Sequence, residues 1–331
     1  MWRVFNDKGN VNTEIGRLSP GIEYRVQSYG YNTANEIAYF TFHNYQIINR
    51  SSYTLNDFYI GGFVDCDLGN ATDDYVGCDV ERGIGYCYNG DNNDEDNGGA
   101  LGYGFQPPAI GVDFFQGPFQ DPNLKDNEIS EDPYEWENNN ANPYAKNTIG
   151  FEDGIVDNER VGMTNFLFFN SDGTVRGDPR TATEYYTFLR SKWRDGTQLT
   201  YGGTGYLGDA NSDPTTPTRH MFPDNSDTAK WSTFGKKPNG PWTEVTAGNT
   251  PFDRRFVYSS GPITLLPGAI NSFTIGFPWA RASSGGPEGS LQKMKEADDI
   301  TQKMFDNCFL PMNMPDAPVL QIKEYDENWY C

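Results

Sequence analysis

Alternating apolar and polar positions mark most of the first third of the chain as β-strand. Between residues 22 and 31, Ile22, Tyr24 and Val26 fall on one face, and residues 37–48 repeat the alternation over a longer stretch. A period of two residues places successive side chains on opposite faces of a sheet. The same pattern predicts strands at 57–64, 83–88, 110–116, 163–170, 255–259, 263–266 and 270–279. Short strands separated by turns predict a mainly β fold, an antiparallel β-sandwich-like module with long loops.

Two stretches show a helical repeat instead. Asp178 followed by Pro179 supplies an N-cap and a proline at the first helical position, and apolar residues recur at helical spacing over 182–193. A second helix is predicted to begin near Ser290, and its apolar stripe extends to Phe305. We expect both stripes to face the core, so the module carries two amphipathic helices.

Two segments interrupt these patterns. Residues 121–160 are rich in Asn and acidic residues, which predicts a long surface loop inserted between strands. Prolines cluster from 311 to 318, ahead of a new alternating stretch at 319–325. We therefore expect a β-rich module over 1–312, and over 313–331 a linker with the first strand of a following module.

The charge of the chain limits its partners. The net charge is −21 and the pI is about 4.4. A surface of this sign repels phosphate backbones and anionic lipid, so nucleic acid is not expected as a partner. No run of 18 apolar residues occurs in the sequence, so we expect no direct insertion into a membrane.

Five aspartates are concentrated between residues 65 and 79, with no lysine or arginine among them: Asp65, Asp67, Asp73, Asp74 and Asp79. Two carboxylates about 4 Å apart repel by roughly 4 kcal/mol at an effective dielectric of about 20. A folded loop that holds several of them needs a cation, bound protons or separation by water. Ca²⁺ accepts six to eight hard oxygen ligands in a flexible shell. We predict a calcium site here; a solvated acidic loop is the alternative.

A second acidic stretch contains Asp91, Asn93 and Asp94. Its oxygen-bearing side chains alternate as in a calcium loop, but the glycine that an EF-hand requires at the sixth position is absent. A metal site and a solvated turn both remain open for this stretch.

The cysteine pattern is closer to that of a secreted protein than to that of a zinc protein, because it has no CxxC spacing and no nearby histidine. We predict one disulfide between Cys66 and Cys78 and another between Cys87 and Cys308. Free buried thiols are the alternative. Cys331, the last residue, is unpaired in this scheme, which suggests that the chain continues.

Catalytic signals are weak. His43 and His220 have no evident nucleophile beside them in the sequence, and neither a Gly-x-Ser-x-Gly elbow nor a phosphate-binding loop is present. Acidic residues are abundant, and we expect Trp136, Trp231 and Trp242 to be exposed aromatics that could stack on sugars. A carbohydrate-binding or glycoside-cleaving domain therefore stays as an alternative to a protein without catalytic activity.

Several segments taken together resemble a family of large secreted surface proteins of Bacteroidota that the type IX secretion system exports. The matching segments are residues 4–10, 45–51, 67–79, 85–91, 107–118, 247–256, 261–268, 298–299 and 305–309. The resemblance implies an extracellular or cell-surface location. It also implies that a signal peptide and a sorting domain lie outside this stretch, and that a fibronectin-III-like module follows residue 312.

The resemblance implies no settled activity. Combined with the acidic stretch, it favours a non-enzymatic, calcium-stabilised module of a larger surface protein, structural or adhesive in role. Its partners would be neighbouring domains of the same chain. Extracellular glycans are the expected partners if the carbohydrate alternative holds. Outer-membrane secretion components are the expected partners if the 121–160 insert makes the contact.

Overall fold

The computed structural model describes residues 1–331 except 8–18, 139–140, 237–239, 310–322, 326–327 and 331. The strands are β1 (Trp2–Asn6), β2 (Ile22–Gly30), β3 (Phe40–Asn49), β4 (Leu55–Asp65), β5 (Asp74–Asp79), β6 (Ile84–Asn89), β7 (Asn93–Asp94), β8 (Gly104–Phe105), β9 (Ala109–Gln116), β10 (Asn165–Asn170), β11 (Arg254–Leu265), β12 (Ile270–Ala280), β13 (Lys323–Tyr325) and β14 (Asn328–Tyr330). The helices are η1 (Glu36–Tyr39), α1 (Ala182–Phe188), α2 (Glu244–Ala247) and α3 (Gly286–Asp306).

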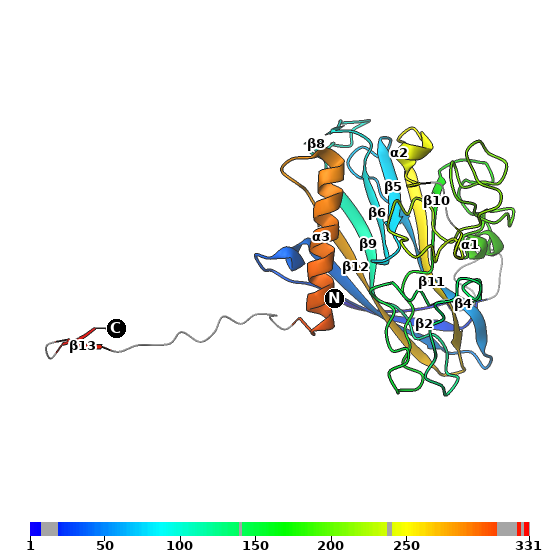
Figure 1. Cartoon of the computed structure of the whole chain (residues 1–331), viewed down its shortest axis with the longest axis horizontal. Helices are drawn as coiled ribbons and strands as arrows, with labels where there is room; N and C mark the ends of the chain where they lie inside the picture. Colours follow the sequence, from blue (N-terminus) through cyan, green and yellow to red (C-terminus); the bar gives the residue numbers. More distant parts are fainter. Residues whose placement is uncertain (8–18, 139–140, 237–239, 310–322, 326–327, 331) are drawn as a thin grey trace.

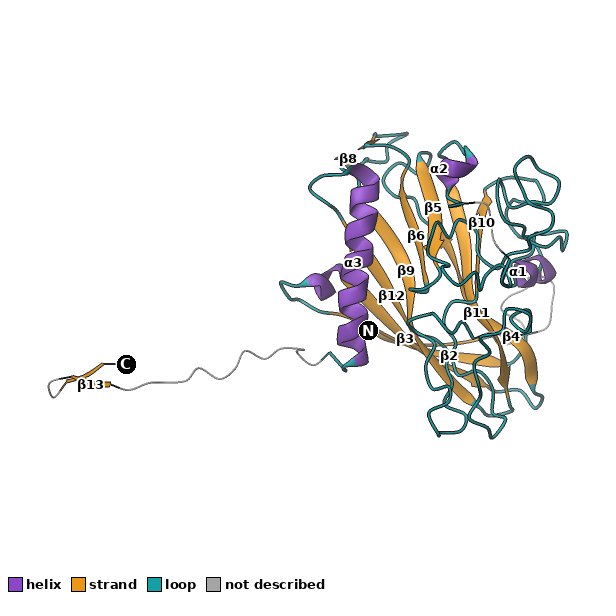
Figure 2. Ribbon diagram, in the orientation of Figure 1, coloured by secondary structure: helices purple, strands orange, loops and turns teal. Residues whose placement is uncertain are grey.

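Two antiparallel sheets form the body of the molecule (Figures 1 and 2). The larger sheet has seven strands in the order β1-β2-β3-β12-β9-β6-β5, and the smaller sheet has three in the order β10-β11-β4. Two short hairpins, β7–β8 and β13–β14, are separate from both sheets. The predicted mainly β, antiparallel sandwich-like fold is confirmed.

The two sheets share one aromatic core. Phe114 of β9 and Tyr258 of β11 meet with ring centroids 5.3 Å apart, which joins the larger sheet to the smaller one. Gly85 of β6 has no room for a side chain, because a Cβ there would lie 2.7 Å from the ring of Phe166 on β10. The sheets therefore pack so closely at this point that only glycine fits between them.

Helix α3 covers the opposite face of the larger sheet (Figure 1). Met294 and Ala297 are buried against that face, as the predicted apolar stripe requires. The helix also buries polar side chains, among them Asp298 and Gln302, and the Gln302 amide donates a hydrogen bond to the carbonyl of Phe115 on β9 (3.1 Å). The sequence pattern did not reveal this polar part of the interface.

The prediction of a single acidic loop over 65–79 was wrong, because β5 occupies residues 74–79 at the edge of the larger sheet. Every residue of β5 is buried. The strands predicted at 255–259 and 263–266 are one strand, β11, whose pairing with β4 is irregular between Ser260 and Ile263.

The two predicted helices are both present, but their limits differ. Helix α1 begins after Thr181, whose hydroxyl accepts a hydrogen bond from the Glu184 amide, so Thr181 and not Asp178 is the N-cap. It ends at Phe188, and Trp193 is buried in the turns that follow. The prediction that its apolar stripe faces the core was wrong for Tyr185 and Tyr186, which are exposed. Helix α3 begins at Gly286, one turn earlier than predicted.

The 121–160 insert contains no helix or named strand in its described residues 121–138 and 141–160. It nevertheless joins the core. Trp136 is buried, and the Arg160 guanidinium donates to the carbonyls of Gly117 and Ser272. The predicted linker near 313 lies outside the described residues.

Candidate metal centre

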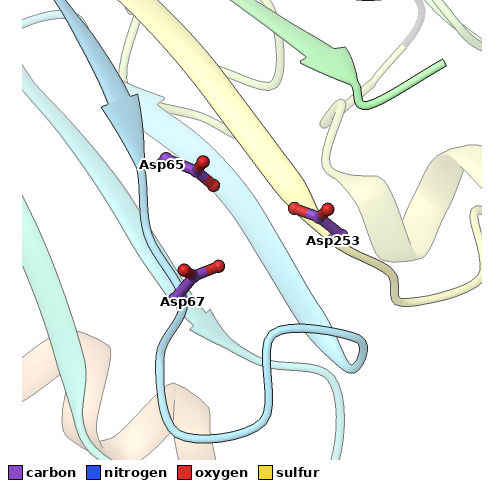
Figure 3. A group of neighbouring side chains, drawn as sticks. All are labelled: Asp65, Asp67 and Asp253. Atoms are coloured by element: carbon purple, nitrogen blue, oxygen red, sulfur yellow. The ribbon is translucent and has the colours of Figure 1, made fainter.

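Three of the acidic side chains meet where β4 ends and β11 begins (Figure 3). Asp65 is the last residue of β4, Asp67 follows it, and Asp253 directly precedes β11. One carboxylate oxygen from each lies within 4.8 Å of the others. We call these three residues the outer acidic group, since Asp65 and Asp67 are exposed and Asp253 is half-buried. Asp253 was not predicted, because nearly 190 residues of sequence separate it from the other two.

The outer acidic group already has a basic partner. Arg255 stands opposite Asp65 in the β4–β11 ladder, and its guanidinium forms ion pairs with Asp65 (3.0 Å), Asp253 (3.5 Å) and Asp178 (2.9 Å). Burial raises the pKa of Asp253, the charge of Arg255 lowers it, and Asp65 and Asp67 raise it again. The arginine thus offsets part of the negative charge that a cation would otherwise neutralise.

A second set of carboxylates lies in the loops next to the start of β5. Asp73 lies in the 66–74 loop, and Asp74 ends that loop as the first residue of β5. Asp94 belongs to β7. We call them the loop acidic group. Asp74 and Asp94 are each 1% exposed. The two predicted acidic stretches are therefore brought together in the fold, through Asp94.

Backbone contacts hold the two loops against each other. The Asp94 carboxylate accepts hydrogen bonds from the amides of Asn70 (2.9 Å) and Tyr103 (2.8 Å). Gly69 has a φ of +71°, and a Cβ there would lie 1.9 Å from an Asp94 oxygen. Only glycine allows the 68–70 backbone to come this close.

Several oxygens of the loop acidic group have no partner in the protein. Asn70 approaches Asp73, but neither Asp73 oxygen accepts a hydrogen bond of good geometry. Asp74 accepts one from the Leu68 amide (3.1 Å) through Oδ2. The Cys87 thiol approaches Asp74, but Oδ1 accepts no hydrogen bond of good geometry. The side-chain oxygen of Asn89, at the end of β6, is also buried without a donor.

The electrostatic surroundings of this group are negative. Burial raises the pKa of Asp73 to about 6, and the charges of Asp94 and Glu95 add to the rise. Burial raises the pKa of Asp74 to about 8, and the charges of Asp73 and Asp94 contribute. Carboxyl groups with raised pKa values and unpartnered oxygens hold either protons or a cation.

The remaining predicted ligands lie elsewhere. Asp91 is exposed, and its carboxylate accepts a hydrogen bond from the Asn93 amide (2.8 Å), as in an ordinary polar turn. Asp79 is at the other end of β5. Five residues separate it from Asp74, so the two side chains point to opposite faces of the sheet. Asp79 forms ion pairs with Arg82 (2.8 Å) and Lys295 (3.4 Å) beneath α3.

Both predicted disulfides were wrong, since Cys66, Cys78, Cys87 and Cys308 are free thiols. The Cys78 thiol donates to the carbonyl of Met221 (3.3 Å), and Cys66 lies beside Cys87 instead. Cys87 faces the core between the sheets, whereas Cys308 is exposed just beyond the end of α3, which covers the opposite face. The sheet separates those two sulfurs.

The three tryptophans expected to stack on sugars are buried. Trp136, Trp231 and Trp242 are 2%, 0% and 2% exposed. His220 is buried with its Nδ1 2.7 Å from the Ser232 hydroxyl, and burial lowers its pKa to about 3. A buried, neutral histidine of this kind is typical of a packed core rather than of a catalytic base.

The insert forms an open cleft of about 680 Å³ whose lining includes Lys125, Asp126, Glu128 and Tyr134. Tyr134 is 93% exposed. Polar and acidic side chains line most of this cleft, and no second observation indicates a ligand for it.

Within the described residues, no helix has both the length and the apolar composition that crossing a bilayer requires. No protein-family model matches the chain, and no curated protein matches it significantly.

Proposed function

We propose that this chain is a non-enzymatic, calcium-stabilised module of a larger extracellular or cell-surface protein, structural or adhesive in role. The observation that carries the proposal is the loop acidic group. It combines three carboxylates, two of them almost completely buried, and the charges that perturb Asp73 and Asp74 come from other carboxylates.

Calcium fits this group better than the available alternatives. Ca²⁺ binds carboxylate, amide and backbone oxygens in an irregular shell, and the unpartnered oxygens of Asp73, Asp74 and Asn89 are ligands of this kind. Mg²⁺ requires near-octahedral geometry and keeps much of its water, so a partly buried, irregular set of oxygens favours calcium over magnesium.

A bound ion would add to the hydrogen bonds that already hold the two loops against each other. The 66–74 loop leads from the smaller sheet into β5, and Asp94 belongs to the short β7–β8 hairpin. Neutralising the carboxylates removes their mutual repulsion and holds both loops at the edge of the larger sheet.

The extracellular location follows from the resemblance to type IX secreted surface proteins, and the metal chemistry agrees with it. Extracellular calcium modules commonly bind with dissociation constants of about 10⁻⁴ to 10⁻³ M. Neighbouring domains of the same chain are the partners that this role implies.

Thermal denaturation with calcium, magnesium or a chelator tests the proposal. At a free calcium concentration about 100 times the Kd, a bound ion adds about 2.7 kcal/mol of stability. For a domain of this size we expect a rise in Tm of about 5 °C, and little rise with magnesium.

Asp73→Asn is the informative variant, because it removes one negative charge from a side chain whose oxygens accept no hydrogen bond of good geometry. We expect it to abolish most of the calcium-induced rise while the protein still folds. Asp57→Asn removes the same charge at an exposed position of β4 and should leave the rise intact. Equal melting curves of the wild type with calcium and with chelator would sink the proposal. Loss of the rise in Asp67→Asn, with retention in Asp73→Asn, would move the site to the outer acidic group.

A further inference from the structure

Two buried carboxylates lie in the interface between α3 and the larger sheet, near enough for the charge of one to act on the other. Asp113 of β9 is 0% exposed, and neither of its carboxylate oxygens has a hydrogen-bond partner. Asp298 of α3 is 2% exposed, and its Oδ1 has no partner either. We call Asp113 and Asp298 the helix-facing pair.

The strand and helix periods place both side chains in the same interface. Val112 and Phe114 belong to the core between the two sheets, so Asp113 lies on the face that α3 covers. Its next neighbour on that face, Phe115, contacts Phe305 of α3 with ring centroids 5.5 Å apart. On the helix, Asp298 stands one turn after Met294, which is 0% exposed.

Other charged groups surround the pair on every element packed against it. Arg82, in the β5–β6 turn, forms ion pairs with Asp79 and Asp299, both at 2.8 Å. Lys146 of the insert pairs with Asp299 as well. Lys295 of α3 lies 3.4 Å from Asp79 and 4.7 Å from the ring centroid of Tyr86 on β6.

The charges in this cluster do not balance when every group is ionised. Among the described residues it contains four carboxylates and three basic side chains. The carboxylates are Asp79, Asp113, Asp298 and Asp299, and the basic side chains are Arg82, Lys146 and Lys295. All three bases form their ion pairs with Asp79 and Asp299. The negative charge that has no ion-pair partner is therefore that of the helix-facing pair.

We propose that Asp113 and Asp298 share one proton at neutral pH, so that an acid–carboxylate hydrogen bond holds α3 against the sheet and is lost in alkaline solution. One proton makes the cluster neutral. It also supplies the donor that the unpartnered oxygens lack. This proposal is independent of calcium binding by the loop acidic group.

The directions of the pKa shifts agree with this assignment. Burial raises the pKa of Asp113 well above its ordinary value, and the charges of Asp298 and Asp79 raise it further. Burial raises the pKa of Asp298 to about 8, and the charge of Asp299 adds to that rise. In the unfolded chain an aspartate titrates near pH 4.

The folded state therefore binds a proton that the unfolded state has released between about pH 4 and pH 8. Stability from this pair is fully present below about pH 4 and is lost as the pH rises through the folded pKa. The expected consequence is that α3 packs less firmly on the sheet in alkaline solution.

Infrared spectroscopy of the full chain tests the proposal directly. We expect the wild-type protein at pH 7 in excess chelator to show the C=O bands of two protonated carboxyl groups, one from this pair and one from Asp74, whose pKa is also raised to about 8. The band of the pair should be missing in Asp113→Asn, and both bands should disappear in alkaline solution. Because the band of the pair is measured on the folded wild type, its absence at pH 7 would overturn the proposal even if a variant failed to fold.

Thermal denaturation in excess chelator at pH 6, 7.5 and 9 supplies a second readout. An asparagine amide can donate the hydrogen bond that the protonated acid donates, so Asp298→Asn should show a smaller fall in Tm between pH 6 and pH 9 than the wild type. Part of the fall should remain, because the pKa of Asp74 is also raised to about 8. Glu296→Gln, on the exposed face of the same helix, should keep the wild-type fall. The same fall in all three proteins would contradict the proposal. So would a rise in the Tm of Asp73→Asn with calcium that disappears when Asp113→Asn is added, since the pair would then bind a metal.

Discussion

The loop acidic group and the helix-facing pair both consist of carboxylates, but the charged side chains around them differ. Both place nearly fully buried carboxylates with unpartnered oxygens at the larger sheet. Around the pair, Arg82, Lys146 and Lys295 neutralise all but one negative charge. Around the loop group, the perturbing charges are other carboxylates. The first arrangement calls for one proton and the second for a divalent cation.

The outer acidic group falls between these two cases. Within the described residues it is the one group of three acids whose carboxylate oxygens all lie within 4.8 Å of one another, yet Arg255 forms ion pairs with two of them. Under our two proposals, the number of basic side chains, rather than the number of acids, decides what each cluster binds. Changing the bases is therefore the most direct way to test the comparison.

The largest effect is expected from removing a base beneath α3. Arg82→Met leaves Asp79 and Asp299 each with one basic partner fewer, in an interface where Asp79 is 2% exposed. We expect a loss of about 3 kcal/mol in the free energy of unfolding, measured by urea denaturation. Lys303→Met, at an exposed position of the same helix, is the control. A loss below about 1 kcal/mol would show that the ion pairs of Arg82 contribute little to the free energy of unfolding.

Removing the base from the outer acidic group should create a calcium requirement there. Without a metal, Arg255→Gln is expected to cost about 2 kcal/mol, because Asp65, Asp178 and Asp253 lose a shared ion-pair partner. Calcium should then recover part of that loss, as a rise in Tm beyond the wild-type rise. If calcium raises the Tm of both proteins equally, the outer acidic group binds no metal even without its arginine.

The pH dependence of the calcium-induced rise in Tm should show whether the loop acidic group, rather than another acidic group, binds the ion. Because the calcium-free pKa values of Asp73 and Asp74 are raised to about 6 and about 8, both groups hold protons at pH 5. Calcium must displace those protons, whereas near pH 8 most have already dissociated. We expect the calcium-induced rise in Tm at pH 5 to be less than half of the rise at pH 8. A rise that is independent of pH would place the ion elsewhere.

The smallest effect is expected from adding a base to the loop acidic group. Ala71→Lys introduces a positive charge two residues before Asp73 at a half-buried position. The calcium-free protein should gain at most about 1 kcal/mol, while the calcium-induced rise in Tm shrinks. Ala71→Gln adds similar length without the charge and serves as the control. Identical calcium responses in the two variants would remove charge balance as the explanation.

Strand periodicity predicted much of the fold. The predicted strands at 22–31 and 270–279 correspond to β2 and β12 within one or two residues. β5 was missed because its two end residues are aspartates, and a charged stretch is typical of a loop. Its interior, Tyr75 to Cys78, is buried between β6 and distant parts of the chain, since the Val76 amide donates to Glu244 and the Cys78 amide donates to the carbonyl of Phe222.

The candidate site was predicted only in part. Asp73 and Asp74 came from the dense acidic stretch, and Asp94 from the second stretch. Nothing in the spacing could show that these two stretches meet, or that Asp253 joins Asp65. The exposure of the tryptophans was predicted wrongly for the same reason, since the sequence alone does not show whether an aromatic side chain in a loop is exposed or buried.

The sequence by itself determined that the chain forms antiparallel sheets and that it carries more acid than its local bases can neutralise. Both properties depend on residue type and on neighbours along the chain. Only the tertiary structure decided which carboxylates meet, which face of the sheet each occupies and which base reaches it. The reason is physical: a shift of one residue turns a side chain to the opposite face, and a Coulomb energy depends on distances and burial that only the folded chain establishes.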